Sequence, residues 1–128
     1  VTLTNTDWKV YLSRQSIGDF QIARAGWIGD YIDPKSFLDM MVTGRGNNQT
    51  GWSNKEYDNL LVKASNSTSQ QERFNYFYEA EKILIDEMPI IPIYTYTRIY
   101  MLHEDVQGWG NNILDSRPYQ FVYLENKN

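Results

Sequence analysis

The stretch ARAGWIGDYIDP, residues 23–34, contains the change of structure around which the sequence is organised. Before it, the side chains of DFQIARAGW alternate between two faces as in a β-strand, and the apolar face ends where Arg24 arrives. At its end, Asp33 followed by Pro34 suits an N-cap and the first position of a helix. The stretch is therefore predicted to be a strand end, a loop and a helix start.

Helical spacing of apolar residues marks the segments on both sides of this stretch. One helix is predicted to begin near Trp8 and to end at Gly18. The same spacing runs through PKSFLDMMV, from Pro34 to Val42. A glycine- and asparagine-rich stretch, TGRGNNQTG, follows as a flexible loop.

Two capping-box patterns, in which a serine is followed three residues later by a glutamate, predict two further amphipathic helices. Ser53 and Glu56 precede the first, and Ser69 and Glu72 precede the second, which we expect to end at Glu87.

Strand-forming residues dominate the chain after these helices. PIIPIYTYTRIYML, residues 89–102, is predicted as a long strand whose two prolines, near its start, keep that end out of a central ladder. YQFVYLE, residues 119–125, is a short strand candidate. The alternation of strands and helices indicates an α/β fold.

Charge and cysteine counts exclude several classes of function. Twelve Lys and Arg against sixteen Asp and Glu leave a net charge of −4, without a basic block, so nucleic acid is not expected as a partner. The absence of cysteine excludes disulfides, thiolate nucleophiles and cysteine-ligated zinc. No apolar run reaches the ~18 residues of a membrane span and no leader opens the chain, so we expect a soluble protein or a processed or truncated piece.

No motif singles out a catalytic site. His103 is the single histidine, so it cannot build a metal cluster alone, and any Ser-His-Asp triad would have to use it. Sixteen carboxylates leave an acid and base pair open, as in a glycosidase. We expect no enzyme, metal or cofactor, and the alternative is a hydrolase using His103 or a carboxylate pair.

The loop in residues 23–34 is the candidate binding region, because α/β folds present ligand-contacting groups between a strand end and a helix start. Asp30 is not the helix cap, since Asp33 has that position. Each residue also has a structural alternative: a solvated carboxylate for Asp30, a core position for Trp27 and a surface ion pair for Arg24.

Three motifs in order resemble the oligopeptide-binding proteins of ABC importers, which form extracytoplasmic solute-binding family 5. They are ARAGWxxDYxDPxxFL, NNxxxxxNxEYDxLL and AEKILxxxxPIIPIY, and the similarity covers about residues 19–96. The resemblance implies a fragment, from the C-terminal part, of a two-lobed periplasmic-binding-protein type II clamp with a mixed sheet and flanking helices. Residues 1–100 would belong to the second lobe, and residues 101–128 would return to the first.

The same resemblance implies roles for individual residues. Asp30 would pair with the α-ammonium of a peptide, Trp27 would line a side-chain pocket, and Arg24 would help to neutralise the ligand's carboxylate. Asn47 would also face the cleft. Ile28 departs from relatives that have cysteine there, which alters the pocket lining and not the capture of charge.

The implied function is that of the substrate-binding component of an ABC importer, in the periplasm or at the cell surface, with a lipid anchor as one form of attachment. Its partners would be short peptides and the membrane permease subunits. We expect the chain by itself to self-associate through surfaces that a first lobe would cover. A stand-alone interaction module, pairing through IYTYTRIYML, is a further alternative.

Overall fold

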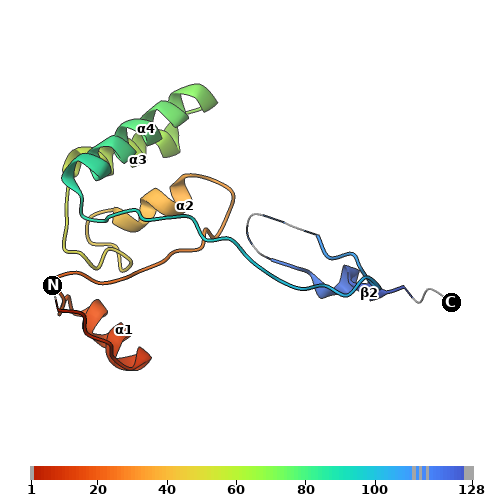
Figure 1. The fold of residues 1–128 in the computed structure, drawn as a ribbon. Helices are drawn as coiled ribbons and strands as arrows, with labels where there is room; N and C mark the ends of the chain where they lie inside the picture. Colours follow the sequence, from red (N-terminus) through yellow and green to blue (C-terminus); the bar gives the residue numbers. More distant parts are fainter. Residues whose placement is uncertain (1, 111, 113, 115, 126–128) are drawn as a thin grey trace.

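The computed structural model describes residues 2–110, 112, 114 and 116–125. Its elements follow one another as α1 (Trp8–Ser16), α2 (Lys35–Leu38), the 3-10 helix η1 (Asp39–Met41), α3 (Lys55–Asn66), α4 (Gln70–Glu87), β1 (Val106–Gln107), the 3-10 helix η2 (Tyr119–Phe121) and β2 (Tyr123–Leu124). The helices α2, α3 and α4 form a helical body, from which the chain after α4 departs as an extended arm carrying β1 and β2 (Figure 1).

The core of the body lies between α3 and α4, which pack side by side (Figure 1). Apolar side chains at helical spacing on both helices meet there, joined by side chains from α2 and η1. The buried members of this core are Leu38, Met41, Tyr57, Leu61, Ala64, Phe77, Ala80 and Leu84. The amphipathic pattern predicted for these two helices is confirmed.

Tyr57 ties α3 to α2. Its side chain is fully buried, and its hydroxyl donates a hydrogen bond of 2.5 Å to the carbonyl oxygen of Leu38. Burial raises the pKa of the Tyr57 phenol well above its ordinary value, because the phenolate would lose its hydration. The Tyr57 ring also meets Trp52 edge to face, with 5.0 Å between the ring centroids. These contacts hold α2, which follows residues 23–34 in the chain, against α3.

The cap of α3 differs from the sequence prediction. Asn54, and not Ser53, is the N-cap, because its side-chain oxygen accepts hydrogen bonds from the backbone N–H groups of Glu56 and Tyr57. Asparagine caps helices as well as serine does, so the side chain of Asn54 takes the role that the capping-box pattern assigned to Ser53.

The other helix boundaries agree more closely with the prediction. The side chain of Ser69 caps α4 by accepting from the backbone N–H of Glu72, and α4 ends at Glu87. The helix α1 covers Trp8–Ser16, within the predicted bounds. The helix predicted up to Val42 is divided in the structure, because α2 gives way to η1 after Leu38.

The strand predicted within residues 19–27 and the long strand predicted over residues 89–102 are absent from the described structure. No backbone hydrogen bond joins residues 91–97 to another described residue. A strand is stable only where a neighbour pairs with its N–H and C=O groups, and the described part of the chain offers none to residues 91–97. The short strand predicted at residues 119–125 is present in part as β2, which pairs with β1 in an antiparallel register that sets Val106 opposite Leu124.

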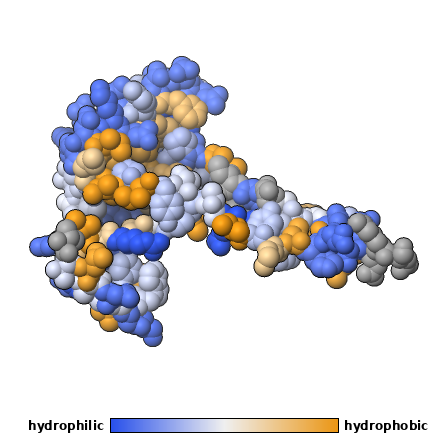
Figure 2. Space-filling model, in the orientation of Figure 1, coloured by the Kyte–Doolittle hydropathy of each residue, from blue (hydrophilic) through white to orange (hydrophobic). Residues whose placement is uncertain are grey.

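Apolar side chains outside the body remain open to solvent. The helix α1 buries no residue, and Ile93 on the arm is 78% exposed. Hydrophobic side chains reach the surface on both the body and the arm (Figure 2). Within the described residues, no helix combines the length and the apolar character needed to cross a membrane.

Candidate functional site

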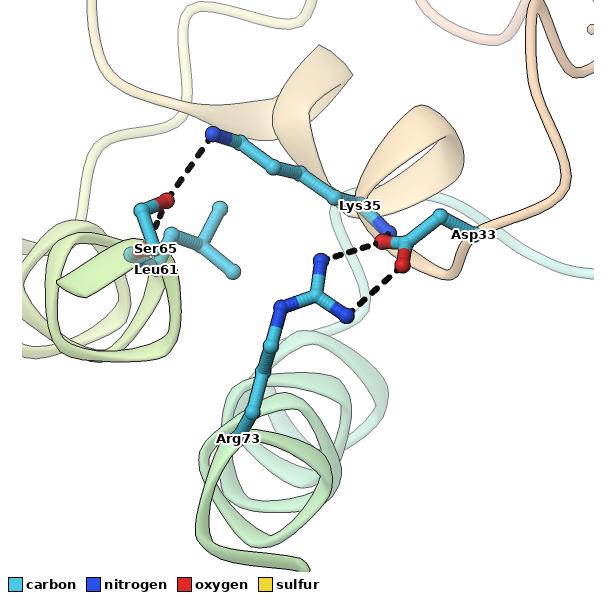
Figure 3. Close-up of polar contacts among 5 residues, drawn as sticks. All are labelled: Asp33, Lys35, Leu61, Ser65 and Arg73. Atoms are coloured by element: carbon cyan, nitrogen blue, oxygen red, sulfur yellow. Dashed lines mark hydrogen bonds and ion pairs between the residues drawn. The ribbon is translucent and has the colours of Figure 1, made fainter. Parts of the chain in front are cut away.

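The start of α2 is fixed by Asp33. Its carboxylate accepts two hydrogen bonds from the Arg73 guanidinium of α4, at 2.7 and 2.8 Å, and a third from the backbone N–H of Lys35 at 2.9 Å (Figure 3). Pro34 already has helical dihedral angles, so Asp33 acts as the N-cap, as predicted. The hydrogen bonds from Arg73 are the main reason that the pKa of Asp33 lies below its ordinary value.

Lys35 joins the start of α2 to α3. Its ammonium donates a hydrogen bond of 2.8 Å to the Ser65 hydroxyl on α3, which in turn donates to the carbonyl oxygen of Leu61 (Figure 3). The first turn of α2 is thus bonded to both α3 and α4, and it gives the loop before it a fixed end.

Ser36 closes that loop onto α2. Its side chain is buried, and its hydroxyl accepts a hydrogen bond of 2.8 Å from the backbone N–H of Asp30. Its carbonyl oxygen accepts a hydrogen bond of 2.9 Å from the indole N–H of the half-buried Trp27. Gly29 lies so close to the Phe37 ring that a Cβ there would be 2.9 Å from the ring edge. These contacts set the positions of Trp27 and Asp30.

A small cavity of about 190 Å³ opens beside this loop. It is lined by Trp27, Asp30, Tyr31, Ser36, Asp39, Met40, Arg45 and Asn47. Ligand pockets for drug-sized molecules usually exceed ~300 Å³, so this cavity suits one residue or one end of a longer ligand. Three of the four predicted site residues, Trp27, Asp30 and Asn47, meet here.

The charged groups of the cavity are two carboxylates and one guanidinium, a net charge of −1. Arg45 and Asp39 form an ion pair, with 3.0 Å between a guanidinium nitrogen and a carboxylate oxygen. The Asp30 carboxylate, by contrast, has no hydrogen bond or ion pair with the other described residues, and Asp30 is exposed. The unpaired negative charge of the cavity is therefore that of Asp30.

The nearby carboxylates also affect the pKa of Tyr31, which lines the same cavity. Burial is the first cause that raises the pKa of its phenol, and the nearby carboxylates of Asp39, Asp33 and Asp30 raise it further. A second anion is disfavoured in this cavity, whereas a cation is favoured.

Asn48 organises the loop that brings Arg45 and Asn47 to the cavity. Its amide donates hydrogen bonds to the carbonyl oxygens of Met41 and Trp52, at 3.1 and 2.8 Å. Its side-chain oxygen accepts a hydrogen bond of 2.9 Å from Thr50. The loop predicted to be flexible is thus internally bonded.

Sequence reasoning missed Tyr31, Ser36, Asp39, Met40 and Arg45 as parts of the site. Asp39 and Arg45 are six residues apart on either side of the end of η1. No motif or helical spacing links the two positions, so a pattern along the chain carries no signal for their ion pair.

Arg24 lies apart from the cavity. Its guanidinium donates a hydrogen bond to the Tyr96 hydroxyl on the arm, and its carbonyl oxygen accepts one from the Tyr11 hydroxyl of α1. It is not among the lining residues. Its guanidinium is exposed and faces the ring of Tyr96 at 6.0 Å from the centroid.

Of the groups that the hydrolase alternative would use, two carboxylates, Asp30 and Asp39, line the cavity, with Asp39 paired to Arg45, but the histidine does not. His103 is on the arm, 3.5 Å from a carboxylate oxygen of Asp105, and does not line the cavity. Among the residues that the structure describes, no three His, Asp or Glu side chains gather as a metal site would require.

Comparisons with known proteins identify relatives along nearly the whole chain, although no family model matches it. It is 43% identical to the dipeptide-binding protein DppE of Bacillus subtilis over 84% of its own length, which is 20% of that relative. It is 35% identical to the periplasmic murein peptide-binding protein MppA of Escherichia coli over 97% of its length, which is 23% of that relative. The chain therefore spans about a fifth of the length of these curated relatives.

Comparison with solved structures gives the same relatives as the sequence comparison. The Escherichia coli murein tripeptide binding protein MppA matches 96% of the chain with a TM-score of 0.87 and 33% identity, and the match covers 24% of that structure. The Haemophilus influenzae OppA complex with the peptide RPPGFSPFR matches the same share of both chains, with a TM-score of 0.86 and 27% identity. This confirms the predicted fold class, and by sequence and structure alike the chain is a homologue of one segment of the two-lobed oligopeptide-binding proteins.

Proposed function

We propose that this chain supplies part of the ligand site of a substrate-binding protein that captures short peptides and passes them to the permease of an ABC importer. The names of its relatives, which are dipeptide-, oligopeptide- and murein peptide-binding proteins, support this function. Several of those names are of periplasmic proteins, which supports a site of action outside the cytoplasm. Binding and release, without catalysis, is the activity that follows.

The observation that carries the proposal is the unpaired carboxylate of Asp30 at the mouth of a small cavity beside Trp27. Every unblocked peptide has an α-ammonium, whatever its sequence, so one fixed carboxylate can bind many peptides by the same end. Once the site closes, the ammonium and the carboxylate leave water together, and each compensates the other's loss of hydration.

The remaining predicted residues have supporting roles in this proposal. Trp27 offers an apolar face to the first side chain of the peptide, and its bond to Ser36 keeps the ring in place. Asn47 offers an amide to the peptide backbone. Arg24 lies outside the cavity, so it would meet a more distant part of the ligand, such as its carboxylate.

The division of the chain into residues 1–100 in one lobe and 101–128 reaching the other belongs to the same proposal. It is supported by the arm, which carries β1 and β2, both beyond residue 100, away from the helical body (Figure 1).

Titration calorimetry tests the proposal on the full-length polypeptide that carries this segment. A tripeptide such as Ala-Ala-Ala should bind, and its N-acetylated form should bind at least ~30-fold more weakly, because acetylation removes the ammonium. Equal binding of the two forms, or binding of neither alongside a correctly folded protein, would contradict it.

A further inference from the structure

We propose that Arg45 determines which side-chain charge the cavity accepts, by neutralising Asp39 and so leaving a single negative charge for a single ligand cation. This inference rests on the proposed function and extends it to the class of peptide: those whose first residue has an uncharged side chain.

The charges of the cavity lead to this preference. Asp30, Asp39 and Arg45 line the same space of about 190 Å³, and the 3.0 Å ion pair leaves only Asp30 without a counter-charge. A peptide's α-ammonium brings that total to zero. A basic first side chain would then add an uncompensated positive charge next to Arg45, and an acidic one would add a negative charge next to two carboxylates.

The position of Arg45 makes it suited to this task. The Arg45 side chain is 57% exposed, whereas that of Asp39 is 24% exposed. The Asp39 carboxylate is therefore the more buried partner, and the Arg45 guanidinium contacts it from the solvent side. Arg45 follows Gly44, whose φ of +73° is a conformation that glycine adopts readily. The bonds of Asn48 hold the other side of the same loop.

Two single variants should therefore shift the preference in opposite directions. Arg45→Gln leaves Asp39 without its partner, and the net charge of the cavity becomes −2, which favours a basic first residue. Asp39→Asn leaves Arg45 without its partner, and the net charge becomes zero, which favours an acidic first residue. The double variant returns the net charge to −1 and with it the original preference.

The experiment measures the affinities of Ala-Ala-Ala, Lys-Ala-Ala and Glu-Ala-Ala for the full-length polypeptide and these variants by titration calorimetry. The ratio of the Lys-first to the Ala-first affinity should rise about tenfold in Arg45→Gln, and the ratio of Glu-first to Ala-first should rise about tenfold in Asp39→Asn. Both ratios should return to within about twofold of the wild type in the double variant. Arg45→Lys, which keeps the charge, should leave them unchanged, and melting temperatures check that each variant folds.

Asp30→Asn separates failure of this inference from failure of the proposed function. If Asp30→Asn weakens all three peptides while neither Arg45→Gln nor Asp39→Asn changes the ratios, the role of Arg45 is wrong and the proposed function stands. If Asp30→Asn changes none of the affinities, the amine site itself is wrong, and the role of Arg45 falls with it.

Discussion

Asp33 and Arg73, forty residues apart in sequence, are joined by two hydrogen bonds of 2.7 and 2.8 Å that hold the start of α2 against α4. The guanidinium also lies over the Phe77 ring, at 4.6 Å from its centroid, so the ion pair sits directly on the core. Because Asp30 and Trp27 bond to Ser36 on the same short helix, this ion pair positions the site as well as the fold.

Breaking this ion pair should destabilise the chain measurably. Arg73→Gln leaves a partly buried carboxylate without its bidentate partner, so we expect the free energy of unfolding to fall by about 1 to 3 kcal/mol. Urea denaturation followed by circular dichroism measures it. Lys82→Gln removes the same charge from an exposed position of α4 and should cost less than ~0.5 kcal/mol. Equal effects of the two substitutions would show that Asp33 gains nothing from Arg73.

The same ion pair predicts a pH dependence. The pKa of Asp33 is lowered in the folded chain from its ordinary value of 3.8, mainly by the bonds from Arg73. The stabilisation is therefore fully present above about pH 5 and is lost as the pH falls through the lowered pKa. The difference in unfolding free energy between the wild type and Arg73→Gln should shrink between pH 5 and pH 2. A difference that stays constant over this range would contradict the assignment.

Trp27 should respond to ligand without being essential to the fold. It is half-buried and lines the cavity, so Trp27→Ala should cost less than the ~3 to 5 kcal/mol typical of a core tryptophan and should weaken peptides with a bulky first side chain most. In the full-length polypeptide, a peptide-induced change of tryptophan fluorescence should disappear in Trp27→Phe. It should persist in Trp8→Phe, which alters an exposed ring on α1. A change that survives in Trp27→Phe would place the ligand elsewhere.

When the 128-residue chain is studied alone, the amide hydrogens of the arm should exchange rapidly with solvent and the chains should self-associate through the arm. The backbone N–H groups of residues 91–97, of which Pro92 has none, have no backbone partner among the described residues, so their hydrogens should exchange within seconds while those of α3 and α4 are protected. Sedimentation should reveal self-association that grows with concentration, and Ile93→Lys should reduce it. Val62→Lys, at an exposed position of α3, should not. A monomer at millimolar concentration would contradict this prediction.

The sequence of this chain predicts its helices better than it predicts which segments pair as β-strands. Helical spacing predicted α1, α3 and α4, and the serine cap predicted for α4 is confirmed, because these elements form their hydrogen bonds within themselves. The segments predicted as strands, within residues 19–27 and over residues 89–102, have strand-like composition, but strand formation depends on a neighbour that the described chain does not offer.

The residues of the candidate site could likewise be predicted from the sequence only in part. Trp27, Asp30 and Asn47 were predicted because they belong to the motifs, and the structure brings them to one cavity, while their binding roles stay predictions. Arg45 and Asp39 were missed because their ion pair depends on how the loop after η1 folds back, which no spacing along the chain reveals. Arg24 was predicted on the same loop as Asp30, but its bond to Tyr96 turns it toward the arm.

The amine-binding role of Asp30 is the central claim, and a double-mutant cycle tests it most directly. Titration calorimetry on the full-length polypeptide would compare Ala-Ala-Ala with its N-acetylated form in the wild type and in Asp30→Asn. We expect Asp30→Asn to weaken the free peptide by about 2 to 4 kcal/mol, or ~30-fold to 1000-fold, and the acetylated peptide hardly at all. Asp86→Asn, an exposed carboxylate on α4, is the matched control and should change neither. Equal losses for the free and acetylated peptides in Asp30→Asn would show that this carboxylate does not bind the amine.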